Sequence, residues 1–165
     1  MNIGIAGAGL IGRLLAWQLL RRGHRVTVFD RDTADGKSSA ARIAAAMLAP
    51  YSEVAGGERE IFEWGVAALA QWPLLLRELK EDSGIDVYFQ RCGSIVVAHK
   101  TDQNHLEHFQ RLLRHAVPEH AARAQILNRA QLTELEPELA QQFDSGIFLE
   151  EEGTLDNREL LAALC

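Results

Sequence analysis

The segment Gly7-Ala8-Gly9-Leu10-Ile11-Gly12 decides the fold class of this sequence of 165 residues. It follows a short apolar run around Ile3 and Ile5 that is typical of a buried strand, and it opens a stretch in which leucines recur at helical spacing. A second apolar run then ends at Asp30. The order strand, glycine-rich turn, helix, strand and acid indicates a βαβ unit that binds the pyrophosphate of a dinucleotide at a helix N-terminus.

Each glycine of the turn has a separate physical role. Gly7 permits a sharp turn after the strand, Gly9 leaves room for a pyrophosphate near the backbone, and Gly12 lets the helix pack against the strand. Asp30 lies 18 residues after Gly12, close to the spacing expected of the acid that binds the ribose hydroxyls. Its carboxylate disfavours the 2′-phosphate of NADP, although Arg31 offsets part of that repulsion.

The composition excludes several other classes of protein. Apolar residues make up 47% of the chain, which is enough for a core, and the net charge is −6 with the basic residues scattered. A nucleic-acid surface needs a basic stripe, and the sequence has none. Two distant cysteines, Cys92 and Cys165, favour a reducing cytoplasm and give no metal-ligand pattern. No apolar run approaches the length of a membrane span, and no Gly-Lys-Ser/Thr of a triphosphate-binding loop follows the turn.

The remainder of the chain changes from this βαβ pattern to a mixed one. A long amphipathic helix is predicted over 58–80, with Pro73 expected to kink or split it. Two strand-like runs, 86–90 and 94–98, predict an antiparallel hairpin. Further elements are predicted as helices over 102–116 and 129–136, strands over 125–127 and 145–149, and a last helix that begins at Asp156 and runs into the end of the sequence. The mixed section indicates a second lobe inserted into, or appended to, the first.

Small side chains dominate the segment Ser38 to Pro50, which allows its backbone to lie close to a large flat group. A short Ala-rich helix in a crowded core is the alternative. Two other clusters are interpreted as solvent-facing: the histidine pair His105 and His108, and the acidic run Glu150-Glu151-Glu152, which is read as a solvated loop rather than a cation site. No metal site is predicted.

Several of these motifs together resemble the FAD-dependent D-amino-acid oxidase superfamily, and within it most closely the glycine oxidases of thiamine biosynthesis. The resemblance covers nearly the whole chain, and its most specific part is the small-residue run that ends in Met-Leu-Ala-Pro. The matching segments are Gly7-x-Gly9-x-x-Gly12, Asp30, Ser38-Ser39, Ala44-Ala45-Ala46-Met47-Leu48-Ala49-Pro50 with Glu53, Ser83-Gly84-Ile85-Asp86, Cys92-Gly93-Ser94-Ile95, Leu132 to Pro137, and Gly146 to Leu155 followed by Asp156-Asn157-Arg158.

The resemblance implies an α/β fold, namely a Rossmann-like FAD-binding βαβ domain of the glutathione-reductase type with part of an inserted α+β substrate domain. Residues 1–85 are then the N-terminal part of the FAD-binding domain, 86–152 part of the substrate or cap domain, and 153–165 the return to the FAD-binding domain. Members of the family are much longer. The fold is therefore expected to be incomplete at the C-terminus, and the arginine that grips the substrate carboxylate is expected beyond residue 165.

The resemblance also implies a set of residues that bind FAD. Leu10 and Ile11 line its adenosine diphosphate half, and Asp30 with Arg31 meets the adenosine ribose. The remaining contacts are expected from Ser38 and Ser39 near the phosphates and from Ala45, Ala46 and Met47 along the flavin. The family usually has glycine where this chain has Ala46, so its extra methyl group either weakens flavin packing or requires the loop to shift.

The activity that the resemblance implies is oxidative deamination of a small amino acid or amine to an imine and then an oxo acid, with O2 reduced to hydrogen peroxide, in the cytoplasm and in thiamine biosynthesis. No catalytic acid or base stands out, and the 165 residues alone are expected to be inactive. Two alternatives remain open at this point, an NAD-dependent dehydrogenase and a non-catalytic dinucleotide-binding subunit. The sequence also leaves homo-oligomer formation open.

Overall fold

The computed structural model describes residues 1–54 and 56–165, and these form two compact units. Unit 1 contains Met1–Ala46, Trp72–Phe89 and Leu155–Cys165, and unit 2 contains Met47–Gln71 and Gln90–Thr154. These units do not coincide with the predicted segments, because 47–71 and 153–154 belong with unit 2 and 86–89 belongs with unit 1. Each unit is a mixed α/β structure, as the sequence predicts.

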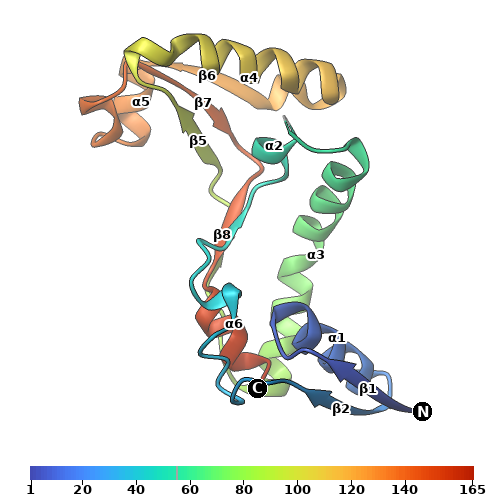
Figure 1. The fold of residues 1–165 in the computed structure, drawn as a ribbon. Helices are drawn as coiled ribbons and strands as arrows, with labels where there is room; N and C mark the ends of the chain where they lie inside the picture. Colours follow the sequence, from blue (N-terminus) through green and yellow to red (C-terminus); the bar gives the residue numbers. More distant parts are fainter. Residues whose placement is uncertain (55) are drawn as a thin grey trace. The chain divides into compact units, whose positions relative to one another are not determined.

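Unit 1 begins with the predicted βαβ pattern, which Figure 1 shows in blue. Strand β1 (Asn2–Ala6) leads into helix α1 (Leu10–Arg21), and strand β2 (Arg25–Phe29) follows. The two strands are parallel and in register from Asn2 opposite Arg25 to Ala6 opposite Phe29. Because of this register, the turn after β1 and the residues after β2 emerge at the same end of the sheet.

Helix α3 (Arg59–Ser83) is one continuous helix, and Pro73 does not split it. Leu69 and Leu76 are buried on either side of the proline, so packing holds the helix together where one backbone hydrogen bond is lost. Within unit 1, the end of α3 is fixed to α1 through Asp82. Its carboxylate accepts hydrogen bonds from Trp17 Nε1 at 2.9 Å and from the Arg21 guanidinium at 2.6 Å, and these donors, Arg21 first, lower the pKa of Asp82.

Helix α6 (Asn157–Ala163) completes unit 1 and begins at Asp156 as predicted. The Asp156 carboxylate accepts hydrogen bonds from the backbone N–H groups of Arg158 and Glu159. Glu159 does not close a reciprocal capping box, because its own carboxylate accepts the N–H of Tyr88 at 2.7 Å. The Asn157 side chain donates to the carbonyl oxygen of Ala44 at 2.7 Å, which anchors the small-residue segment.

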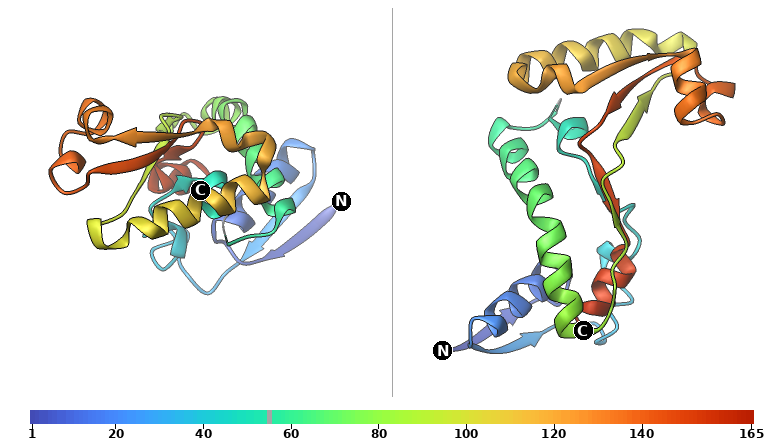
Figure 2. Two further views of the ribbon diagram at one scale, coloured as in Figure 1. Left: turned by 90° about the horizontal axis from the view of Figure 1, so that it is seen from above. Right: turned by 180° about the vertical axis from the view of Figure 1, so that it is seen from behind.

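Unit 2 is built on an antiparallel sheet in the order β5-β7-β6. Helix α4 lies along this sheet, as both views of Figure 2 show, and its Leu106 and Leu113 pack with Ile147 and Leu149 of β7 in the core. Elements of this unit include β5 (Ser94–Val97), α4 (Gln103–Ala116), β6 (Ala124–Asn128), α5 (Arg129–Leu135) and β7 (Ser145–Leu149), with the short helix α2 (Pro50–Glu53). The predictions of helices over 102–116 and 129–136 and of strands over 125–127 and 145–149 are thus confirmed within one or two residues.

The predicted hairpin between 86–90 and 94–98 is wrong. Strand β5 pairs with β7, and β4 (Phe89–Gln90) neighbours β8 (Gly153–Leu155) in a second sheet of order β3-β8-β4, where β3 is Met47–Leu48. The two runs are consecutive stretches of one extended segment rather than the two arms of a turn. The Gly93 N–H donates to the Glu152 carbonyl at 2.8 Å and so bridges the interruption between these stretches. Gly93 between the two runs favoured a local hairpin, but both runs instead pair with strands that lie far later in the sequence.

The interpretation of Glu150-Glu151-Glu152 as a solvated loop is only partly right, because Glu150 is exposed in a turn whereas Glu152 is buried. The Glu152 side chain is fully buried and accepts hydrogen bonds from the Ser52 N–H at 2.6 Å, from the Ser52 hydroxyl at 2.8 Å and from the Ser94 hydroxyl. Glu151 forms an ion pair with Arg123. The donors come from segments far away in the sequence, which is why charge pattern alone suggested a solvent-facing loop. The buried carboxylate ties α2 and β5 to the turn after β7.

We predict that Glu152→Ala lowers the free energy of unfolding by about 2–4 kcal/mol, because it removes a buried acceptor bonded to three donors and leaves these half-buried donors without that acceptor. Urea unfolding followed by circular dichroism measures the change. Glu150→Ala is the matched control, since Glu150 is exposed and its loss should change stability by less than about 0.5 kcal/mol. Equal effects of the two substitutions would show that the carboxylate does not hold these segments together.

Candidate dinucleotide-binding site

A cavity of about 700 Å³ lies entirely within unit 1, a size suited to a cofactor. It is formed by the end of β1, the glycine-rich turn, the start of α1, the loop after β2 and the short 3-10 turn Ala40–Arg42. The structure brings nine of the predicted site residues together in its wall: Gly7, Gly9, Leu10, Ile11, Gly12, Asp30, Arg31, Ser38 and Ser39. Ala45, Ala46 and Met47 are not part of this wall.

The start of α1 is open to the cavity. Gly9 is its N-cap residue and has no side chain to bond the first N–H groups of the helix, and a Cβ on Gly9 would meet nothing within 4 Å. A Cβ on Gly12, by contrast, would collide with the carbonyl oxygen of Gly7, so only glycine permits this approach of the helix to the turn. The helix therefore presents unpaired N–H groups and a partial positive charge where an anion can approach.

Asp30 joins the end of β2 to the glycine-rich turn. One carboxylate oxygen accepts the N–H of Ala8 at 2.5 Å and the other accepts the N–H of Asp32 at 2.8 Å. These donors, Ala8 first, lower the pKa of Asp30. The stabilisation that this shift provides is complete above the ordinary pKa of an aspartate and is lost as the pH falls through the lowered value. At neutral pH the site therefore holds a charged acceptor whose remaining lone pairs are available to hydroxyl groups.

Asp32 is a second carboxylate of the cavity wall, and the sequence analysis did not single it out. It accepts the N–H of Ser38 at 2.7 Å and that of Thr33 at 2.9 Å. The hydroxyl and then the N–H of Ser38 are the main causes that lower the pKa of Asp32. The carboxylate thereby shapes the loop that carries Ser38 to the cavity. The feature of the sequence that could have indicated Asp32 is its position two residues after Asp30, on the same loop.

Arg13 also lines the cavity and was missed from the sequence. Arg13 is only 6% exposed. Its guanidinium donates hydrogen bonds to the carbonyl oxygens of Ala8 at 2.6 Å, Ala34 at 2.7 Å and Leu161 at 3.4 Å. It also donates to the Cys165 sulfur at 2.7 Å. The signal in the sequence was its position, because residues 13, 16 and 17 form the buried stripe of α1 and a cation is out of place there.

Ala46 adopts the left-handed backbone conformation, with φ of +56°. An alanine in this region costs roughly 1–2 kcal/mol relative to its usual conformations, whereas glycine adopts it freely. The carbonyl oxygen of Ala46 accepts the N–H of Leu155 at 3.3 Å, which helps to hold the residue in place. The geometry thus accounts for a preference for glycine at this position.

Comparison with known proteins identifies the family. The family model described as DAO, FAD dependent oxidoreductase, matches residues 2–165. The chain belongs to this family. The resemblance recognised from the motifs is therefore confirmed, and the cofactor of the family is FAD rather than NAD.

Individual relatives agree with this assignment. The chain is 32% identical over 164 residues to the putative thiamine biosynthesis oxidoreductase ThiO of Rhizobium etli, a match that covers 99% of this chain and 45% of that protein. The crystal structure of glycine oxidase from Geobacillus kaustophilus is similar with a TM-score of 0.83 and 28% identity, covering 98% of this chain and 42% of that one. The chain therefore spans less than half the length of the relatives that it matches.

The residues of the cavity fit the adenosine diphosphate half of FAD. The open start of α1 suits the diphosphate, and the ionised Asp30 suits the ribose hydroxyls. Among the described residues, no cluster of His, Cys, Asp and Glu is arranged to hold a metal ion, and His105 and His108 are exposed on α4. No helix in the described part of the chain has the length and hydropathy needed to cross a bilayer.

We predict that Ala46→Gly raises the free energy of unfolding by about 0.5–1 kcal/mol, because relief of the left-handed strain exceeds the added entropy of the unfolded chain. Ala45→Gly is the matched control. Ala45 is not among the residues with positive φ, so the same substitution there should lower stability by about 0.5–1 kcal/mol. Thermal and urea unfolding of the two variants measure the difference, and a loss of stability in both would refute the assigned strain.

Proposed function

We propose that this chain provides the ADP-binding part of an FAD-dependent oxidase that deaminates a small amino acid or amine. The observation that carries the proposal is the arrangement at the cavity, where the open start of α1 and the Asp30 carboxylate face a space of suitable size. The family match across residues 2–165 supports FAD as the ligand of that space. The relatives named glycine oxidase and ThiO support glycine or a similar small amine as the substrate.

The proposed roles of the individual residues follow their positions. Leu10 and Ile11 flank the diphosphate at the helix start, where Gly9 allows it to approach the backbone N–H groups. Asp30 accepts hydrogen bonds from the ribose hydroxyls, with Arg31 beside it. The other proposed contacts are those of Ser38 and Ser39 with the phosphates and of Ala45, Ala46 and Met47 with the flavin.

FAD, when bound, supplies the acceptor for the hydride that leaves the substrate carbon. The proposed role of the residues of this chain is to bind and orient the cofactor. None of them is proposed as an acid or base in the reaction. The imine product is proposed to hydrolyse to an oxo acid and ammonia, with O2 reduced to hydrogen peroxide. A cytoplasmic enzyme of thiamine biosynthesis fits the name of the ThiO relative and the cysteine content.

The activity test uses the full-length protein that carries this chain. We predict that it purifies yellow with flavin absorbance, and that glycine causes oxygen uptake and hydrogen peroxide formation in an oxygen-electrode assay. The 165 residues alone are expected to show no turnover. A colourless, folded protein that gives no calorimetric heat with FAD would contradict the proposal. A flavoprotein without turnover of any small amine would instead support the non-catalytic subunit.

Asp30→Asn tests the site itself. The amide replaces one acceptor oxygen by a donor that meets the Ala8 N–H or the ribose hydroxyls, so we predict that ADP affinity falls at least about tenfold. Isothermal titration calorimetry of the full-length proteins freed of FAD measures the change. Asp35→Asn is the matched control, because Asp35 lies on the same loop and outside the cavity wall. An unchanged ADP affinity in Asp30→Asn would show that Asp30 does not contribute to nucleotide binding.

A further inference from the structure

The guanidinium of Arg13 is a buried cation in an unfavourable place. Arg13 is the fourth residue of α1, so its charge lies in the first turn of the helix, where the helix dipole disfavours cations. The residue is only 6% exposed, and among the described residues it forms no ion pair with a carboxylate. Its partners are neutral carbonyl oxygens and a sulfur atom, which satisfy its N–H groups without neutralising its charge.

The loop after β2 is shaped around this cation. The Ala34 carbonyl oxygen points to Nη2, and a Cβ on Gly36 would lie 2.8 Å from the same nitrogen. The Ala8 carbonyl oxygen, in the glycine-rich turn, bonds Nε. The two loops that form the cavity are thus both fastened to Arg13, and Arg13 is itself part of the cavity wall.

We propose that Arg13 is a positioning residue that fastens the two loops of the cavity and provides the buried countercharge for the diphosphate of the bound dinucleotide. The inference rests on the proposed function, since it deepens the same site. A buried cation without an anionic partner lowers the stability of the empty site, and an anion in the cavity compensates it. The preference for a phosphorylated ligand over an unphosphorylated one therefore depends on the charge at position 13.

The test compares ADP with adenosine, since the two differ in the diphosphate. In the full-length protein freed of its FAD, Arg13→Gln should weaken ADP binding at least about tenfold more than it weakens adenosine binding, as measured by calorimetry. Arg13→Lys retains the positive charge but lacks the three nitrogen donors of the guanidinium, and it should keep the preference for ADP over adenosine. A purely structural role of Arg13 would instead weaken both ligands by the same factor in both variants, and that result would overturn the proposal.

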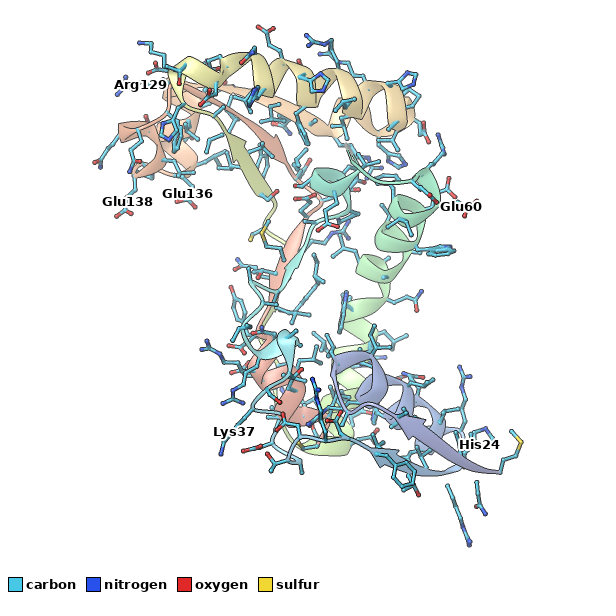
Figure 3. The ribbon with its side chains drawn as sticks, viewed as in Figure 1. His24, Lys37, Glu60, Arg129, Glu136 and Glu138 are labelled. Atoms are coloured by element: carbon cyan, nitrogen blue, oxygen red, sulfur yellow. The ribbon has the colours of Figure 1, made fainter. Side chains whose placement is uncertain are left out.

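Lys37→Gln is the matched control for the loss of one positive charge. Lys37 lies on the same loop, its side chain is 75% exposed and projects away from the ribbon in Figure 3, and it pairs with Asp35 at 3.0 Å. Solvent and salt screen such a charge, so the ratio of ADP to adenosine affinity should remain within about twofold of the unaltered value. An equal loss in Lys37→Gln and Arg13→Gln would show that net charge, and not the buried cation, sets the preference.

A second measurement does not depend on whether Arg13→Gln folds. In isotope-labelled unaltered protein freed of its FAD, the NMR signal of the Arg13 side-chain N–H groups, assigned by its loss in Arg13→Lys, should shift with ADP and stay in place with adenosine. An unshifted signal with saturating ADP would overturn the proposal while leaving the nucleotide site intact. Failure of the unaltered protein to bind ADP at all would overturn the proposed function, and this inference with it.

Discussion

The parallel register of β1 and β2 is the constraint on which the candidate site depends. With Ala6 opposite Phe29, the Gly7 N–H reaches the Phe29 carbonyl at 2.7 Å, and the next residues, Ala8 and Asp30, are joined by the carboxylate. A slip of one residue would separate this pair and turn the Asp30 side chain to the other face of the sheet. The acid, the turn and the helix start meet because two strands pair in one register.

This part of the fold was predictable because its signals are local. Gly12 must be glycine to clear the Gly7 carbonyl, and the spacing to Asp30 follows from one helix and one strand of ordinary length. The same holds for α5, where Asn128 and Gln131 form a capping box that the sequence displays within four residues. The three glycines and Asp30 were predicted from these local signals, whereas the other five predicted residues of the cavity wall, Leu10, Ile11, Arg31, Ser38 and Ser39, were implied by the family resemblance.

Arrangements that depend on distant partners were not predictable. The segment 89–97 pairs with 145–155 rather than with itself, and the chain between them gives no sign of that choice. Glu152 resembled its exposed neighbour Glu150 in sequence, yet Ser52 and Ser94 supply donors that bury it. Arg13 was overlooked for a similar reason, since the carbonyl oxygens that accept its hydrogen bonds come from residues 8, 34 and 161. Burial of a charge is decided by its partners, and these are seen only in the folded chain.

Positive and negative groups occupy different parts of the cavity wall. The start of α1 and the Arg13 guanidinium make one part of the wall positive, whereas Asp30 and Asp32 make another part negative. The Ala8 N–H lowers the pKa of Asp30, and the hydroxyl and N–H of Ser38 lower that of Asp32. A dinucleotide offers the complementary sequence of groups, an anionic diphosphate next to a neutral ribose with hydroxyl donors. A ligand with a second phosphate on that ribose would place like charges together near Asp30 and Asp32. On the proposed function, this polarity favours a ligand whose diphosphate lies at the start of α1, and it disfavours a 2′-phosphate beside the two carboxylates.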